Sequence, residues 1–201
     1  GFADSSIRAW DLGRLRAYLP DHAGRQWRDR LSVTSGGYLD GNSARLFRSG
    51  KEAGYGYRGH NLWRIDPRDG RLVEGRNFDT YSAKAQADSM AAWIQRLPAG
   101  TLVAAAIRDE GSVSMNEAAH LALESLGSAL SRSVGARDSW ALLGRKGAAP
   151  GSVLEVLKKS QSGPAVIDTV LVFPEGASSF STGLHLPADA GGEVVIFSAK
   201  G

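Results

Sequence analysis

The chain has 201 residues, of which 42% are hydrophobic and 22% are charged, a balance typical of a folded globular protein rather than a disordered one. Its formal net charge is only +3, with 24 Lys and Arg residues spread along the sequence, so we expect no nucleic-acid partner. Cysteine is absent, which excludes disulfides and thiolate metal sites.

No segment of the sequence predicts membrane insertion. The longest wholly apolar run, residues 102–107, is far shorter than the roughly 20 residues that a membrane helix needs. The sequence begins at Gly1 without a methionine or an apolar signal segment. This start indicates a fragment or a processed product of a larger parent protein.

The first third of the chain predicts a short helix followed by a β-meander. Apolar residues recur at helical spacing over residues 5–19, and Pro20 ends the pattern. Glycine-rich turns, including residues 54–59, then separate three β-prone runs at residues 31–34, 44–48 and 61–65. Asp66-Pro67-Arg68-Asp69-Gly70 predicts a tight turn. We expect a further strand at residues 72–79 to pair back across it.

Two helices flank a central strand in the prediction for the middle of the chain. Ser82 is expected to cap the first helix, whose apolar stripe consists of Met90, Trp93, Ile94 and Leu97. The continuously apolar residues 101–108 predict a strand covered on both faces. After the polar turn Asp109-Glu110-Gly111-Ser112, the pattern Ser114-Met115-Asn116-Glu117 predicts a capping box for the second helix.

Gly127 is expected to end that second helix in the left-handed conformation. A strand at residues 139–143 should follow it. In the tail we expect a short helix at residues 153–159 and strands at residues 166–173 and 193–198. The tail either completes the same sheet or belongs to a neighbouring domain.

The residues give no pattern for catalysis. His22, His60, His120 and His185 lack the spacing of a metal site. Nucleophile-elbow, dinucleotide-binding and phosphate-loop motifs are absent. Asp109 and Glu110 are adjacent, so their side chains diverge and cannot flank one bond. We therefore expect no catalytic residue, no metal and no cofactor.

Three polar residues stand at predicted strand ends. Arg58 precedes one strand, Asp109 follows the central strand, and Arg137 precedes the strand that contains Trp140. Ligands commonly bind at strand ends in α/β sheets. The alternative is a set of salt bridges that fix loops, and spacing alone favours this alternative.

Several motifs resemble the interleukin-like EMT inducer domain in order and approximate spacing over residues 58–147. They are Tyr57-Arg58-Gly59-His60-Asn61-Leu62, Phe78-Asp79-Thr80-Tyr81, Arg108-Asp109-Glu110-Gly111-Ser112, Ser125-Leu126-Gly127-Ser128, Arg137-Asp138-Ser139-Trp140 and Gly144-Arg145-Lys146-Gly147. Within this family the chain is most similar to the stem domain of protein O-mannose N-acetylglucosaminyltransferase, a non-catalytic lectin-like module. The absence of cysteine departs from the disulfide-bonded animal members, and we expect a bacterial member.

The resemblance implies an α+β fold (α/β in the broad sense). This fold is a compact β-β-α sandwich of mixed sheet with two main helices packed on it, plus the N-terminal helix and a strand-rich tail. The implied division is residues 1–29 as a helical extension, 30–150 as the family domain and 151–201 as a C-terminal helix and strands.

The resemblance also implies a binding site. Arg58, Asp109 and Arg137 match the sugar-contacting positions of the stem domain. The supporting residues are Tyr57, Glu110, Ser112, Asp138 and Trp140. Tyr57 or Trp140 would offer a stacking face, although a core role is equally compatible with Trp140.

The function implied is a non-catalytic, lectin-like carbohydrate-binding module. Its ligand would be a glycan, for example one containing N-acetylhexosamine. The module would be an extracytoplasmic part (periplasmic, cell-surface or secreted) of a larger glycan-processing or cell-surface protein, such as a glycosyltransferase linked to a membrane domain. The alternatives are a protein-interaction module without a sugar ligand and an enzyme that uses Asp109 or Glu110 as acid or base.

Overall fold

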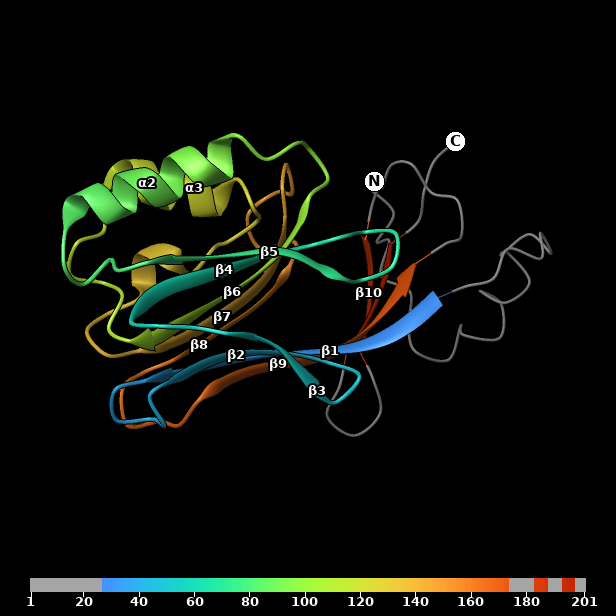
Figure 1. Ribbon diagram of the computed structural model, residues 1–201, viewed down its shortest axis with the longest axis horizontal. Helices are drawn as coiled ribbons and strands as arrows, with labels where there is room; N and C mark the ends of the chain where they lie inside the picture. Colours follow the sequence, from blue (N-terminus) through green and yellow to red (C-terminus); the bar gives the residue numbers. More distant parts are fainter. Residues whose placement is uncertain (1–26, 174–182, 188–192, 198–201) are drawn as a thin grey trace, which may run out of the picture.

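The structure, a computed structural model, describes residues 27–173, 183–187 and 193–197 (Figure 1). These residues form an eleven-stranded sheet with helices α2 (Lys84–Gln95), α3 (Glu117–Glu124) and the 3₁₀ helix η2 (Ser131–Ser133). No helix in these ranges is long and apolar enough to cross a membrane. The strands are β1 (Trp27–Gly37), β2 (Ser43–Arg48), β3 (Lys51–Tyr55), β4 (Gly59–Ile65), β5 (Leu72–Phe78), β6 (Leu102–Asp109), β7 (Ser139–Arg145), β8 (Leu154–Lys158), β9 (Ala165–Phe173), β10 (Gly183–Pro187) and β11 (Glu193–Phe197).

The sheet branches and folds over itself, so it makes two layers. Its main path is β10-β11-β9-β1-β6-β4-β5, with β2 and β3 branching from β1 and with β7 and β8 branching from β6. Helices α2 and α3 cover the layer that contains β4, β6 and β7, while β1, β2 and β9 lie on the other side of that layer (Figure 1). The predicted α+β fold, a β-β-α sandwich of mixed sheet, is confirmed.

β6 is the strand that both cores share. Its side chains alternate between the faces, as a pleated strand requires. Val103, Ala105 and Ile107 lie in the core beneath the helices, whereas Leu102, Ala104 and Ala106 lie in the core between the two strand layers. The prediction of a strand covered on both faces is therefore confirmed.

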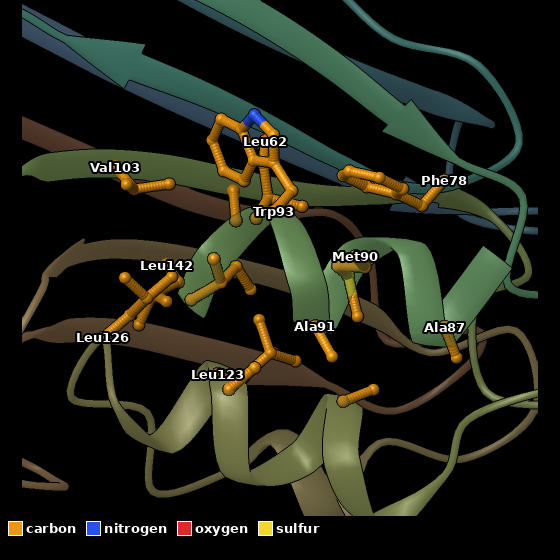
Figure 2. Packing of buried hydrophobic residues seen from close by; sticks show 14 of the residues in the cluster. Leu62, Phe78, Ala87, Met90, Ala91, Trp93, Val103, Leu123, Leu126 and Leu142 are labelled. Carbon is orange, nitrogen blue, oxygen red and sulfur yellow. The ribbon is translucent and has the colours of Figure 1, made fainter. Parts of the chain in front are cut away.

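The core beneath the helices follows from the periodicity of α2 and α3 (Figure 2). Trp93 packs beside Phe78 of β5, with ring centroids 6.2 Å apart. Fully burying a large apolar side chain stabilises a fold by about 1.5–3 kcal/mol. Buried residues recur every three or four positions in both helices, at Ala87, Met90, Ala91 and Ile94 in α2 and at Ala119, Ala122 and Leu123 in α3.

Both predicted helix caps are wrong by one or two residues. α2 has Ala83 as its N-cap, and the hydroxyl of Ser82 donates instead to the Asp79 carbonyl. α3 is capped by Asn116, whose side chain accepts from the Ala119 amide at 2.9 Å. Ser114 does not cap α3 because its hydroxyl donates to the Tyr81 carbonyl, in the loop before α2. The left-handed end at Gly127 is confirmed, with φ of 97°.

The helix predicted at residues 153–159 is also wrong, because residues 154–158 form strand β8. β8 pairs antiparallel with β7, from Ser139 opposite Lys158 to Leu143 opposite Leu154. Short apolar runs fit a helix or a strand equally well, and the open edge of β7 decides between them. The strands predicted at residues 166–173 and 193–198 are confirmed as β9 and β11. The helix predicted at residues 5–19 lies outside the described residues.

The end of β1 joins β6 and β7 where these two strands separate. β6 and β7 pair only as far as Ala106 and Ala141. Beyond this point Gly36 and Gly37 of β1 lie parallel to β6. The Ser35 hydroxyl donates to the Ile107 carbonyl at 2.7 Å and accepts from the Trp140 amide at 2.8 Å. One buried hydroxyl thus bridges three strands.

The Ser139 hydroxyl of β7 makes a matching hydrogen bond to the backbone of β1. It accepts from the Gly37 amide at 3.0 Å. Both serines are fully buried, and a buried backbone group left without a partner is costly. The Ser35 hydroxyl therefore supplies the hydrogen bonds that continuous pairing of β6 and β7 would otherwise give to the Ile107 carbonyl and the Trp140 amide, and the Ser139 hydroxyl satisfies the Gly37 amide of β1.

Replacing Ser35 by Ala should lower the free energy of unfolding by about 1–3 kcal/mol, because the Trp140 amide and the Ile107 carbonyl lose a buried partner. Denaturant unfolding of purified protein measures this change. The matched control is Ser32→Ala in the same strand, where the side chain is only partly buried and a change within about 0.5 kcal/mol is expected. Equal stability of the two variants would contradict this account of β1.

Candidate functional site

Five loops meet at one end of the molecule, opposite the β4–β5 turn (Figure 1). We call this region the loop end. It consists of residues 37–42, 56–58, 79–83, 110–116 and 134–138. The Tyr38 amide donates to the Asp109 carbonyl at 2.9 Å, and the Ser114 amide donates to the Thr80 carbonyl at 2.7 Å. The loops therefore form one connected surface.

Buried carboxylates hold the loops together. Glu110 is 5% exposed and accepts from the Ser112 amide at 2.7 Å, the Ser112 hydroxyl at 2.7 Å and the Arg137 amide at 2.6 Å. Asp138 is 4% exposed and accepts from the Gly135 amide and from Lys159. Glu110, Ser112 and Asp138, all predicted as supporting residues, therefore position the loops from within.

The electrostatics of Asp138 agree with a structural carboxylate. Burial by itself raises the pKa of Asp138. Hydrogen bonds from Lys159, Gly135 and Ser160 outweigh this effect, and the pKa lies below its ordinary value. Asp138 is thus ionised and fully engaged at neutral pH.

Asn61 fixes the loop that carries Tyr57 and Arg58. Its side-chain amide donates to the Tyr57 carbonyl at 2.7 Å, and its side-chain oxygen accepts from the Tyr57 amide at 2.8 Å. Asn77 adds a bond to the Arg58 carbonyl at 3.0 Å. A β-carbon at Gly56 would lie 2.4 Å from the Asn61 side chain, so the loop closes tightly on this asparagine.

The Arg58 side chain is paired within the protein. It forms a salt bridge with Asp79 at 2.7 Å and stacks over Tyr81, 4.6 Å from the ring centroid. Hydrogen bonding from Arg58 is the main cause that lowers the pKa of Asp79. Asp109 also lies close enough to favour the charged form of Arg58. The direct partner of the Arg58 guanidinium is therefore Asp79, and Asp109 adds only a weaker electrostatic contribution.

Asp109 and Arg137 both adopt the left-handed backbone conformation, with φ of 64° and 59°. This region is unfavourable for residues other than glycine, and such residues cluster at functional sites. Within the described residues, the Asp109 carboxylate has no hydrogen bond and no ion pair. The Arg137 guanidinium has no carboxylate partner there and stacks on Tyr38, 4.7 Å from the ring centroid. A free acceptor and a free donor therefore stand at one surface.

The structure adds exposed tyrosines that the sequence analysis did not assign. Tyr38 and Tyr81 join Tyr57 in the loop end, and Tyr55 ends the adjoining strand β3. These four side chains are between 45% and 64% exposed. Tyr55 and Tyr57 meet edge to face, with centroids 5.9 Å apart. The available signal was the presence of tyrosines in polar, glycine-rich loops.

Arg108 also lies at this surface, although it was not among the site residues predicted from the sequence. Its guanidinium donates to the Tyr55 hydroxyl at 2.6 Å and to the Gly56 carbonyl at 3.0 Å. It also lies over the Tyr55 ring, 5.3 Å from the centroid. Arg108 therefore orients Tyr55 on the surface.

Trp140 has no exposed face for a ligand, in contrast to its predicted supporting role. The side chain is fully buried, and its indole nitrogen donates to Glu155 at 2.8 Å. Glu155 also accepts from the Ala129 and Leu130 amides. The sequence was compatible with a ligand-stacking role or a core role for Trp140, and the structure shows the core role.

A buried polar pair lies beneath the Asp109 turn. The Thr80 hydroxyl donates to the Gly111 carbonyl at 2.8 Å, so the His60 Nδ1 at 2.8 Å must be protonated and donate to Thr80. Burial, together with the nearby His120, lowers the pKa of His60 to about 3. His60 is therefore a neutral structural histidine. Among the residues described, no group of three or more candidate ligands could hold a metal ion.

The comparisons with known proteins agree with the motif resemblance. Residues 58–148 match the family model of the interleukin-like EMT inducer, so the predicted resemblance is confirmed over this segment. The human cell migration-inducing and hyaluronan-binding protein is 32% identical over 102 residues, which cover 51% of this chain and 8% of that protein. Human protein FAM3A is 33% identical over 90 residues, 45% of this chain and 38% of that protein. Less than two fifths of either relative is matched, and both are animal proteins.

Stability should fall on acidification because of His60. Its pKa rises from about 3 when folded to its ordinary value of 6.5 when unfolded, so protons bind the unfolded chain first. The resulting stabilisation is complete above pH 6.5 and is lost as the pH falls toward 3, by about 1.4 kcal/mol per pH unit. Between pH 7 and pH 5 the wild type should lose about 2 kcal/mol more than His60→Asn in denaturant unfolding. If the unfolding free energies of the wild type and His60→Asn changed equally between pH 7 and pH 5, the lowered pKa of His60 would be refuted.

The left-handed conformation of Arg137 predicts an unusual order of stabilities. Arg137→Gly should be more stable than Arg137→Ala by about 1 kcal/mol, because both lose the Tyr38 contact but only glycine relieves the strain. Thermal and denaturant unfolding measure the difference. At Arg132, in η2, the order should reverse, because glycine weakens helical segments. An alanine variant at position 137 as stable as the glycine variant would show that this backbone is not strained.

Proposed function

We propose that the loop end is the binding surface of a non-catalytic module and that its ligand is a glycan. The observation that carries this proposal is the pair formed by Asp109 and Arg137. Both are held in the left-handed conformation by the surrounding loops. Within the described residues the Asp109 carboxylate has no hydrogen bond or ion pair, and the Arg137 guanidinium stacks on Tyr38 without a carboxylate partner. Strain maintained at such positions favours a binding role over a purely structural one.

The available groups suit sugar recognition. A carboxylate such as Asp109 accepts paired hydrogen bonds from vicinal hydroxyls, and the planar fork of Arg137 donates to ring or acetamide oxygens. Exposed tyrosines such as Tyr38 and Tyr57 offer an apolar face with a polar tip. Arg58 is oriented by Asp79 and completes the set near Asp109.

The comparisons support a glycan without identifying it. The name of one relative describes a hyaluronan-binding protein, and the motif resemblance to a glycosyltransferase stem domain indicates an N-acetylhexosamine-containing ligand. We infer a lectin-like, extracytoplasmic module from a bacterial member of the family, attached to a glycan-processing or cell-surface parent. Affinity for a single sugar should be weak, roughly micromolar to millimolar, because few polar contacts must offset ordering and desolvation.

A protein-interaction module is the second candidate. Tyrosine and arginine are enriched at protein interfaces, and the loop end exposes both. In that case Arg58 and Asp79 would serve only as a loop-fixing salt bridge. The catalytic alternative has less support, because the Glu110 carboxylate already accepts three hydrogen bonds and no acid or base among the described residues is hydrogen-bonded to the Asp109 carboxylate.

Binding to a glycan array, followed by calorimetric titration with N-acetylglucosamine oligomers and hyaluronan fragments, tests the proposal. Asp109→Asn and Arg137→Gly should each weaken binding at least tenfold, because each removes a charge-assisted hydrogen bond worth about 1.5–3 kcal/mol. Both variants should remain folded by circular dichroism.

Arg71→Ala is the matched control, since Arg71 is an exposed arginine paired with Asp69 at the opposite end of the sheet. It should bind as the wild type does. A wild type that binds no glycan, or Asp109 and Arg137 variants with unchanged affinity, would refute the carbohydrate proposal. Capture of a protein partner that is insensitive to Arg58→Ala would favour the second candidate.

A further inference from the structure

We propose that the β8–β9 loop, residues 159–163, forms a second subsite of the loop end, so that the ligand is an oligosaccharide rather than a single sugar. This inference rests on the proposed function and extends the same surface. The loop lies outside the segment that matches the family model, residues 58–148.

Two buried carboxylates fix the loop. Asp40, which is 9% exposed, accepts from the Gln161 amide at 2.9 Å and the Gly163 amide at 2.7 Å. Asp138 accepts from the Ser160 amide at 2.9 Å and from the Lys159 ammonium at 2.8 Å. Burying a carboxylate is costly unless it is well paired. Here the hydrogen bonds from the loop amides and from Lys159 offset that cost, and they fix the loop in one conformation.

The same carboxylates connect this loop to the first subsite. Asp138 directly follows Arg137 in the chain, and Asp40 belongs to the loop that carries Tyr38. Tyr38 and Arg137 stack on each other. The β8–β9 loop is therefore tied to both loops that present this pair, and the polar surface continues from Arg137 and Tyr38 onto residues 159–163.

Gln161 has the longest side chain with a free polar group in this loop, beside Ser160 and Ser162, whose hydroxyls also have no hydrogen-bond partner within the described residues. Its backbone has φ of 69°, its side chain is exposed, and the side-chain amide has no hydrogen-bond partner within the described residues. Among those residues, five that are not glycine have a left-handed φ, and four of the five lie at this end: Asn42, Asp109, Arg137 and Gln161.

The chemistry of the second subsite follows from its charges. Lys159 is engaged by Asp138 and the Ser133 carbonyl, and Asp40 is engaged by two backbone amides. This pairing leaves only neutral groups, the amide of Gln161 and the hydroxyls of Ser160 and Ser162, which can donate and accept at once. These groups match the hydroxyl or acetamide of an adjoining sugar, so the second position should take an uncharged sugar residue.

The experiment compares a monosaccharide with a longer oligomer. The probes are N-acetylglucosamine and its β1,4-linked tetrasaccharide, or the monosaccharide and tetrasaccharide of whichever glycan the array selects. Calorimetry measures both probes with the full chain and with Gln161→Gly and Gln161→Asn. Asparagine keeps an amide and tolerates a left-handed φ, whereas glycine removes the amide and accepts that φ without strain.

The wild type should bind the tetrasaccharide roughly three- to tenfold more tightly than the monosaccharide, as expected for one or two added hydrogen bonds. Gln161→Gly should abolish this gain without weakening monosaccharide binding or lowering the melting temperature. Gln161→Asn should keep most of the gain.

Two outcomes would overturn the inference. Equal affinity of wild type and Gln161→Gly for the tetrasaccharide, while Asp109→Asn still weakens binding, would remove the second subsite and leave the proposed function standing. A wild type that binds neither probe would refute the two proposals together.

Discussion

The insertion of β1 beside β6 is the constraint on which the rest of the structure depends. β6 and β7 cannot pair beyond Ala106 and Ala141 because the end of β1 lies between their continuations. The Ser35 hydroxyl satisfies the Ile107 carbonyl and the Trp140 amide exposed by this separation, and the Ser139 hydroxyl satisfies the Gly37 amide of the inserted strand. They stabilise the division of the sheet into two layers at this point, since unpaired buried backbone groups are costly.

The same insertion determines how the loop end is assembled. It places Gly37 opposite Asp109 and brings Tyr38 to the Asp109 carbonyl. The approach is close enough that a β-carbon at Gly37 would lie 1.9 Å from the Arg137 carbonyl oxygen. Three segments far apart in the sequence therefore meet at one strand end. The segment matched by the family model begins only at residue 58, yet this arrangement depends on β1.

The polar residues at the loop end form two groups: buried carboxylates that fix the loops, and residues on those loops that are proposed to bind the ligand. Glu110, Asp138 and Asp40 are buried and accept backbone amides from neighbouring loops. Asp109 and Arg137 have left-handed backbones, and within the described residues their charged groups have no ion-pair partner, although Arg137 stacks on Tyr38. Rigid carboxylate contacts reduce the ordering cost of binding, so the first group supplies the preorganisation that the second group requires.

The sequence by itself determined the features that depend on neighbouring residues: the stripe of α2, the apolar run of β6, the left-handed end at Gly127 and, through motif resemblance, Arg58, Asp109 and Arg137 as a candidate site. Only the tertiary structure decided which distant strand or side chain each of the other segments and polar groups contacts. The helix predicted at residues 153–159 became β8 because the edge of β7 was open. Trp140 lies in the core beneath the helices, where Glu155 accepts a hydrogen bond from its indole N–H. Local periodicity reports which face of a segment is buried. It does not report which distant strand or carboxylate lies against that face, and tertiary packing alone makes that choice.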